Sequence, residues 1–275
     1  GITWFPLLMY FYEKAAKNKK IVYGVLAGLP IGLMFLSGNP QIALYGLLSA
    51  VLFFLFRTFF NLKLLLFPML SIIIGLSLAA IQVAPSLEFS NFSVRSGGLS
   101  YEFASDFSLH PYQLITLFLP HFFGSPLLQN TYWGISGNFW ELSLYSGVLP
   151  LILATIAIIH KRNKYVLFFA ILLLFSLMFS FGRFFYLFKF FYDFVPGFDL
   201  FRAPARILFL FSFSLAILAG FGTTIKENKY FKSFLFILIA IFATTATILI
   251  YINTNSKQII NFIASKGYAL GNNLE

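Results

Sequence analysis

Long apolar runs separated by short polar stretches dominate this chain of 275 residues. Seven of the runs approach or exceed the roughly twenty residues that a helix needs to cross a bilayer. The spans expected are about 21–37, 41–56, 64–85, 141–159, 165–182, 203–222 and 230–252. We therefore predict an all-α fold, a polytopic transmembrane helix bundle of about seven spans that forms a single domain over residues 1–275.

The least apolar part of the chain is the stretch 86–140, which we expect to be a loop outside the bilayer. Within it, PYQLITLFLP at 111–120 is too short to span and predicts a re-entrant or interfacial helix. A second loop, 183–199, is aromatic nearly throughout. Since Phe and Tyr gather at the headgroup level, this loop is either a membrane anchor or a platform for a lipid tail or sugar ring.

Composition places the chain among integral membrane proteins. Charged residues make up only 10% of the chain and hydrophobic residues 59%, whereas a soluble domain is about a quarter charged. The net charge of +10 is spread in short clusters between apolar runs, without an RNA-binding or helix-turn-helix motif, which argues against nucleic acid as a partner. The absence of cysteine excludes disulfides and Cys-ligated metal or redox centres.

The distribution of charge predicts the orientation of the bundle. If all seven runs cross, one set of loops holds twelve of the 19 lysines and arginines but only two acids, Glu13 and Glu227. The other set holds seven cations and seven acids. The positive-inside rule then puts the first set in the cytoplasm, and places 86–140, 183–202 and 253–275 outside.

The outer loop carries three ionisable residues at helical spacing, Glu102, Asp106 and His110. On a helix they would share one face and could form a metal site or an acid/base cluster; the alternative is a solvated surface turn. Pro111 would end such a helix at about His110. We expect His121 to be an ordinary hydrogen-bonded group rather than a ligand.

Arg202 and Arg206 stand four residues apart at the start of the run 203–222, on the outer side and against the usual charge bias. Pro204 suits a helix N-terminus, whose free N–H groups and dipole favour an anion. Two guanidiniums one helical turn apart can hold one phosphate with charge-assisted hydrogen bonds. The alternative is that both extend to the headgroups of bulk lipid.

Five stretches together resemble the YfhO-like family of bacterial multi-spanning membrane proteins, which belong to the GT-C class of glycosyltransferases. They are LSGNPQIALYGLL at 36–48, APSLEFSNFSVRSGGLSYEFASDFSL at 84–109, LFLPHFFG at 117–124, ELSLYSGVLPLILA at 141–154 and VPGFDLFRAPARILFLFSFSLAILAGFG at 195–222. Their order and spacing fit as well, and the resemblance covers roughly residues 20–225.

The resemblance implies transfer of a sugar from a polyprenyl-phosphate carrier to a cell-envelope polymer, such as a teichoic acid, outside the bacterial cytoplasmic membrane. It also implies that Arg202 and Arg206 hold the carrier's phosphate. Supporting candidates are Glu102, Asp106 and Glu141 for acid/base catalysis, and Glu88, Arg95, His110, His121 and Trp133 for substrate binding. No ligand set for a metal is assigned, and a divalent metal stays open as a cofactor.

Two departures limit what carries over from the family. It often has Gly-His-Pro-Gln where this chain has Gly38-Asn39-Pro40-Gln41, so a role for that histidine is lost. GT-C enzymes also place a catalytic Asp or Glu in a first outer loop, which would precede Gly1. The opening GITWFPLLMYFY indicates the tail of a helix, so we expect an inactive fragment of a longer protein, with its catalytic base upstream.

A transporter is the alternative to an enzyme. A flippase or permease for a polyprenyl-linked saccharide would use the same spans and outer arginines. Its pathway usually needs ionisable residues near the bilayer midplane, whereas here they stand at span ends. A non-catalytic scaffold would leave the polar outer loop without a use.

The predicted orientation can be tested by cysteine labelling, because the chain has no cysteine of its own. In intact cells, an impermeant thiol reagent should label Asp106→Cys and leave Asn163→Cys unlabelled. Labelling at 163 but not at 106 would overturn the orientation.

Overall fold

The structure, a computed structural model, describes residues 1–93, 97–127, 132–134 and 139–225, together with the single residues Thr244, Thr247 and Thr254. The rest of the expected span 230–252 and the candidate residue Arg95 therefore lie outside the described residues. The chain divides into two units, Gly1–Ile225 and Lys226–Glu275. The description below concerns the first unit.

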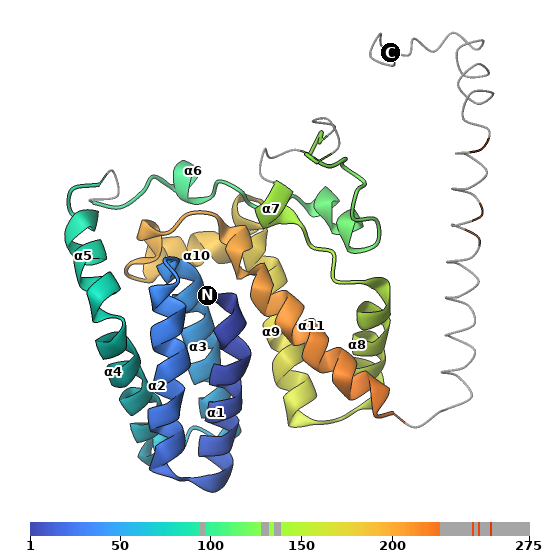
Figure 1. Ribbon diagram of the computed structural model, residues 1–275. Coiled ribbons are helices and arrows are strands. Elements are labelled where there is room, and N and C mark those ends of the chain that lie inside the picture. Colours follow the sequence, from blue (N-terminus) through green and yellow to red (C-terminus); the bar gives the residue numbers. More distant parts are fainter. Residues whose placement is uncertain are drawn as a thin grey trace. The chain divides into compact units, whose positions relative to one another are not determined.

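All regular structure in the described part of this unit is helical (Figure 1), which confirms the all-α prediction there. The α-helices are α1 (Phe5–Asn18), α2 (Ile21–Leu36), α3 (Pro40–Arg57), α4 (Leu66–Leu78), α5 (Ala80–Ser90), α6 (Tyr101–Ala104), α7 (Phe139–Leu142), α8 (Val148–His160), α9 (Lys164–Ser180), α10 (Tyr186–Phe194) and α11 (Leu208–Thr223). Short 3₁₀ helices join them: η1 (Ile2–Trp4), η2 (Leu62–Leu64), η3 (Pro111–Leu117), η4 (Gly182–Phe184), η5 (Phe198–Leu200) and η6 (Pro204–Ile207).

Among the described residues, two helical stretches are long and apolar enough to cross a membrane, Pro40–Arg57 and Pro204–Thr223. They coincide with the expected spans 41–56 and 203–222. A third crossing results if Leu62–Leu78 and Ala80–Ser90, which are bent by 77° against each other, count as one span. The expected span 64–85 is thus broken at its last third.

The other expected spans in this unit form shorter apolar helices. α2, α8 and α9 have 16, 13 and 17 residues, fewer than the roughly twenty that a straight crossing needs. The span expected at 141–159 shortens most, because Gly147 adopts a positive φ of 91° and α8 begins only after it. By length and composition the described helices account for two or three crossings and are compatible with a membrane protein.

The opening residues form a buried helix of their own. α1 carries four side chains that are almost fully buried: Phe5, Leu8, Tyr12 and Ala15. The hydroxyl groups of Tyr12 and of Ser71 on α4 share a hydrogen bond of 2.8 Å. The stretch that the sequence indicated as the tail of a helix is therefore part of the hydrophobic core.

Glycine residues set the contact between α2 and α4, which lie side by side (Figure 1). Gly24, Gly28 and Gly32 recur at every fourth residue of α2, and Gly75 stands opposite on α4. A Cβ on Gly28 would lie 3.2 Å from the carbonyl oxygen of Ser71, and a Cβ on Gly75 would lie 3.0 Å from that of Gly28. The two backbones therefore approach as closely as small residues allow, which is how membrane helices commonly associate.

Replacing Gly28 by alanine should destabilise the fold, because the new methyl group would also lie 2.6 Å from Ile74. Overpacking of this kind costs about 1–3 kcal/mol. Gly220→Ala on α11 is the matched control, since a Cβ there meets no neighbouring atom within 4 Å. Thermal unfolding in detergent should show a lower midpoint for Gly28→Ala only, and equal midpoints would refute the close contact.

Candidate functional site

The segment 99–110 of the expected outer loop packs onto the end of α9 and the start of α11. The Leu109 N–H donates to the carbonyl oxygen of Ser180, the last residue of α9, at 2.8 Å. The Ala203 N–H donates to the carbonyl oxygen of Ala104 at 3.2 Å. Acids and arginines that are distant in the sequence come together at this end of the bundle.

Of the two alternatives for Glu102, Asp106 and His110, the continuous helix does not form. α6 ends at Ala104, and Phe107 takes a left-handed φ of 55°, which a continuous helix does not allow. The three side chains therefore do not share a helical face, which agrees with the alternative of a surface turn and leaves the acid/base cluster without support from helical spacing. Within the part of the chain that the structure describes, no group of three or more His, Asp or Glu is arranged to hold a metal ion.

Asp106 instead bridges two arginines. Its Oδ1 accepts a hydrogen bond from Nη2 of Arg183 at 3.0 Å, and its Oδ2 accepts one from Nη2 of Arg202 at 2.9 Å. The guanidinium of Arg202 also lies over the rings of Phe103 and Phe107, at 4.2 and 4.7 Å from their centroids. These cation–π contacts fix the guanidinium beside the carboxylate.

Gly182 brings Arg183 to this carboxylate. It has a left-handed φ of 50°, and a Cβ at this position would collide with the hydroxyl of Ser108. That hydroxyl accepts the backbone N–H of Arg183 at 3.0 Å. The Arg183 side chain donates in addition to the carbonyl oxygens of Glu102 and Ser105, at 3.2 and 3.4 Å. The end of α9 is thereby tied to the loop around Asp106.

A cavity of about 410 Å³, here called the arginine cavity, lies beside this group. It is lined by Asp106, Phe107, Ser108, His110, Gln113, Arg183, Phe184 and Arg202. The imidazole of His110 stacks edge-on against Phe184, with ring centroids 4.5 Å apart. Its Nδ1 accepts the backbone N–H of Tyr112 at 3.3 Å, so the neutral ring carries its proton on Nε2 and can donate there.

Arg206 belongs to a second polar group with a different carboxylate. Its Nε donates to Oε1 of Glu141 at 2.8 Å, and its Nη1 donates to Oε1 of Gln41 at 3.1 Å. Gln41 is buried and donates from Nε2 to the hydroxyl of Tyr45 at 3.1 Å. Because Arg202 and Arg206 contact different carboxylates, one phosphate held between them would require both ion pairs to open.

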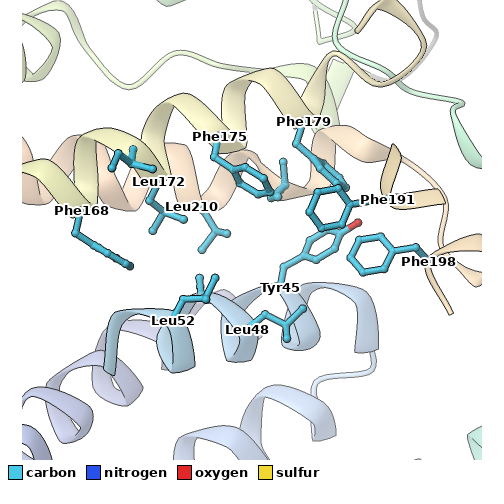
Figure 2. A pocket seen from close by; sticks show the side chains of 13 residues that line it. Tyr45, Leu48, Leu52, Phe168, Leu172, Phe175, Phe179, Phe191, Phe198 and Leu210 are labelled. Carbon is cyan, nitrogen blue, oxygen red and sulfur yellow. The ribbon is translucent and has the colours of Figure 1, made fainter. Parts of the chain in front are cut away.

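Tyr45 also borders an apolar cavity of about 290 Å³ (Figure 2). The cavity is lined by Tyr45, Leu48, Ser49, Leu52, Phe168, Ile171, Leu172, Phe175, Phe179, Phe191, Phe198, Ile207 and Leu210. Figure 2 shows the ring of Phe198 beside that of Tyr45, and their centroids are 6.2 Å apart. Leu52 and Ile171 are more than half exposed, so this cavity opens on the outside of the bundle.

The aromatic loop expected at 183–199 contains the amphipathic helix α10. Phe188 is buried, whereas Tyr186 and Phe190 are exposed, as expected of an interfacial helix. Partial burial raises the pKa of Tyr101, which packs against α10, while the charge of Lys189 lowers it. The net shift is upward, so this phenol stays neutral at physiological pH.

The remaining candidate residues lie outside both polar groups. Glu88 is on α5, a helix without a buried residue. His121 is exposed in a turn, and Trp133 is exposed with its ring centroid 4.9 Å from that of Phe123. The contacts that the structure describes connect none of these three to Asp106 or Glu141.

Sequence reasoning missed Arg183, Gln41 and Tyr45 as members of the site. Arg183 follows the expected span 165–182 on the same side as Arg202, so a count of cations per loop could have paired them. Gln41 is a polar residue in the first turn of an apolar run, and polar side chains in such runs commonly bond across helices. Tyr45 gave no signal, because an isolated tyrosine in an apolar helix is common.

No known protein family, curated protein or solved structure matches this chain. The resemblance to the YfhO-like family therefore stays a prediction.

Glu141→Gln should destabilise the protein, because Arg206, with 27% of its side chain exposed, loses a charged partner. A hydrogen bond to a charged group contributes about 1.5–3 kcal/mol. Asp193→Asn is the matched control, because Asp193 and its partner Lys189 are 37% and 47% exposed and such pairs contribute little. The thermal midpoint should fall more for Glu141→Gln than for Asp193→Asn, and the reverse order would contradict the assignment.

Proposed function

We propose that the chain is the membrane part of a GT-C type glycosyltransferase, which transfers a sugar from a polyprenyl-phosphate carrier to a cell-envelope acceptor. The position of Tyr45 carries this proposal. Its ring lines the apolar cavity, and its hydroxyl is linked through Gln41 to Arg206. An apolar cavity that can hold hydrocarbon thus lies next to a polar group that contains a cation. A lipid-linked phosphate requires both features.

In this proposal the cavity takes a segment of the isoprenoid chain, and the carrier's phosphate pairs with Arg206 in place of Glu141. The reaction is an inverting displacement at the anomeric carbon of the sugar. The bond from that carbon to the carrier phosphate breaks, and a bond to the acceptor oxygen forms. Arg206 stabilises the negative charge that grows on the leaving phosphate.

An acidic residue removes the proton of the acceptor hydroxyl. Within this chain the supporting candidates for this base are Glu102, Asp106 and Glu141. A divalent metal stays an open cofactor.

The proposed orientation places the two polar groups outside a bacterial cytoplasmic membrane, on a bundle of about seven spans that includes 230–252. A third ion-paired group supports this orientation. Glu13 accepts from Arg57 at 3.0 Å and from the Tyr165 hydroxyl at 3.2 Å. These residues stand at the ends of α1, α3 and α9 that are opposite to Gln41 and Ser180, next to the cation-rich loops assigned to the cytoplasm.

The transfer reaction is tested with the full-length gene product in membranes, supplied with labelled polyprenyl-phosphate sugars. Release of free carrier phosphate together with sugar on an envelope acceptor would establish a transferase. Arg206→Gln should lower this release roughly 100-fold, the size of effect seen when one stabilising donor is removed. Lys189→Gln, which removes an exposed cation of α10, should leave it unchanged.

Two outcomes would contradict the proposal. Movement of intact carrier across the membrane without release would identify a flippase, and the Arg206 group would then be a headgroup site. If a folded Arg206→Gln variant releases carrier phosphate at the unchanged rate, this arginine does not take part in the reaction. The thermal midpoint of each variant separates a loss of function from a loss of fold.

A further inference from the structure

We propose that Arg183 and Arg202 form a second anion site, which binds the phosphate group of a ligand in place of the Asp106 carboxylate. This site is separate from the Arg206 group, and it depends neither on a polyprenyl carrier nor on sugar transfer. It is built by the arginine cavity and the two guanidiniums that border it.

The charges around the arginine cavity favour an anion. Among the described residues that line it, two guanidiniums stand against one carboxylate. His110 adds a neutral ring with a proton on Nε2. The lining therefore has one positive charge in excess, together with a further hydrogen-bond donor.

The two guanidiniums are held by contacts that do not involve Asp106. Arg183 is fixed by the carbonyl oxygens of Glu102 and Ser105. Arg202 lies over two aromatic rings, and its buried Nε donates to no described protein atom. Both cations would therefore stay in position if the carboxylate moved away, and Arg202 would still have a donor to use.

Asp106 marks where an anionic group fits. Its two oxygens join the two Nη2 atoms at 3.0 and 2.9 Å, and two oxygens of a phosphate can make the same bridge. The carboxylate is 37% exposed, and ion pairs with this exposure contribute little to stability. Asp106 can therefore be displaced, and it offsets one of the two positive charges while the site is empty.

The arginine cavity extends beyond the two guanidiniums to Phe107, His110 and Phe184. Its volume of about 410 Å³ leaves room for an organic group beside the phosphate. A phosphate ester fits this description, either in a soluble molecule or in a lipid headgroup. These two sources share the chemistry and differ in whether the ligand must come from a membrane.

Phosphate binding can be measured on the purified full-length protein as a thermal shift at constant ionic strength. Inorganic phosphate is the first probe. Asp106→Asn should raise the apparent affinity roughly tenfold, because the internal competitor loses its charge. Arg183→Gln and Arg202→Gln should each lower it by about the same factor. Lys189→Gln is the control, because it removes a cation that does not line the cavity, and it should leave the phosphate affinity unchanged.

In a binding site, phosphate affinity should rise for Asp106→Asn and fall for the two arginine variants. In a purely structural group, all three variants would weaken the fold alike. If Asp106→Asn does not fold, Arg183→Gln decides, because that arginine is 44% exposed at the surface. Phosphate affinity that equals the wild-type value in Arg183→Gln overturns the proposal. A loss of phosphate affinity in Arg206→Gln alone also overturns it, because the bound phosphate would then lie at the Arg206 group.

The source of the phosphate is found with two further probes. Glycerol phosphate in solution represents a soluble ester, and nanodiscs with and without phosphatidylglycerol represent a headgroup. A thermal shift that occurs with one of these probes and is abolished by Arg183→Gln supports the site. The probe that causes the shift then identifies the source of the phosphate. Absence of such a shift with all three probes overturns the proposal.

Discussion

Arg206 is the side chain on which the candidate site depends, because it joins three segments that are far apart in the sequence. It donates to Glu141 in α7 and to Gln41 at the start of α3, and it stands itself in η6 before α11. A guanidinium at the end of an apolar helix needs such partners, since a half-buried charge without them is costly. Because Gln41 also bonds Tyr45, the same interaction fixes one wall of the apolar cavity.

The other helices of the bundle depend on specific contacts as well. In lipid there is little hydrophobic driving force between helices, so close packing and hydrogen bonds must hold them together. The glycines of α2 and α4 provide the first, and the Tyr12–Ser71 bond provides the second. At the end opposite to Arg206, Glu13 adds a link from α1 to α3 and α9 through Arg57 and Tyr165. Specific contacts therefore hold the bundle along the length of α2 and α4 as well as at both ends.

The sequence predicted the helical class because a backbone in lipid must satisfy its own hydrogen bonds, which long apolar runs do as helices. Runs 41–56 and 203–222 appear as expected for that reason. The break between α4 and α5 was not predicted, because it falls at Ala79 among good helix formers, whereas Gly75 and Pro85 lie about one turn or more away on either side. Packing distinguishes the two halves, since α4 packs closely against α2 and α5 has no buried residue.

The candidate site was predictable in its residue types but not in its pairings. The sequence analysis singled out Arg202, Arg206, Asp106 and Glu141. Because the two arginines stand four residues apart, it suggested that they act together. The extended backbone before Pro204 and the left-handed Ala203 separate their side chains. Arg183 reaches Asp106 across 77 residues of sequence, a distance at which no local pattern reports a contact.

The pairing of each arginine with a carboxylate has a consequence for ligand choice. Binding of an anion at either group is an exchange, because the incoming group must replace a carboxylate that is already bound. A second carboxylate gains little from this exchange, since the attraction that it forms resembles the one that it breaks. A phosphate monoester carries more charge and more acceptor oxygens than a carboxylate, so it gains from both guanidiniums of the Asp106 group. The internal carboxylates thus offset part of the positive charge in the empty state and select against weaker anions.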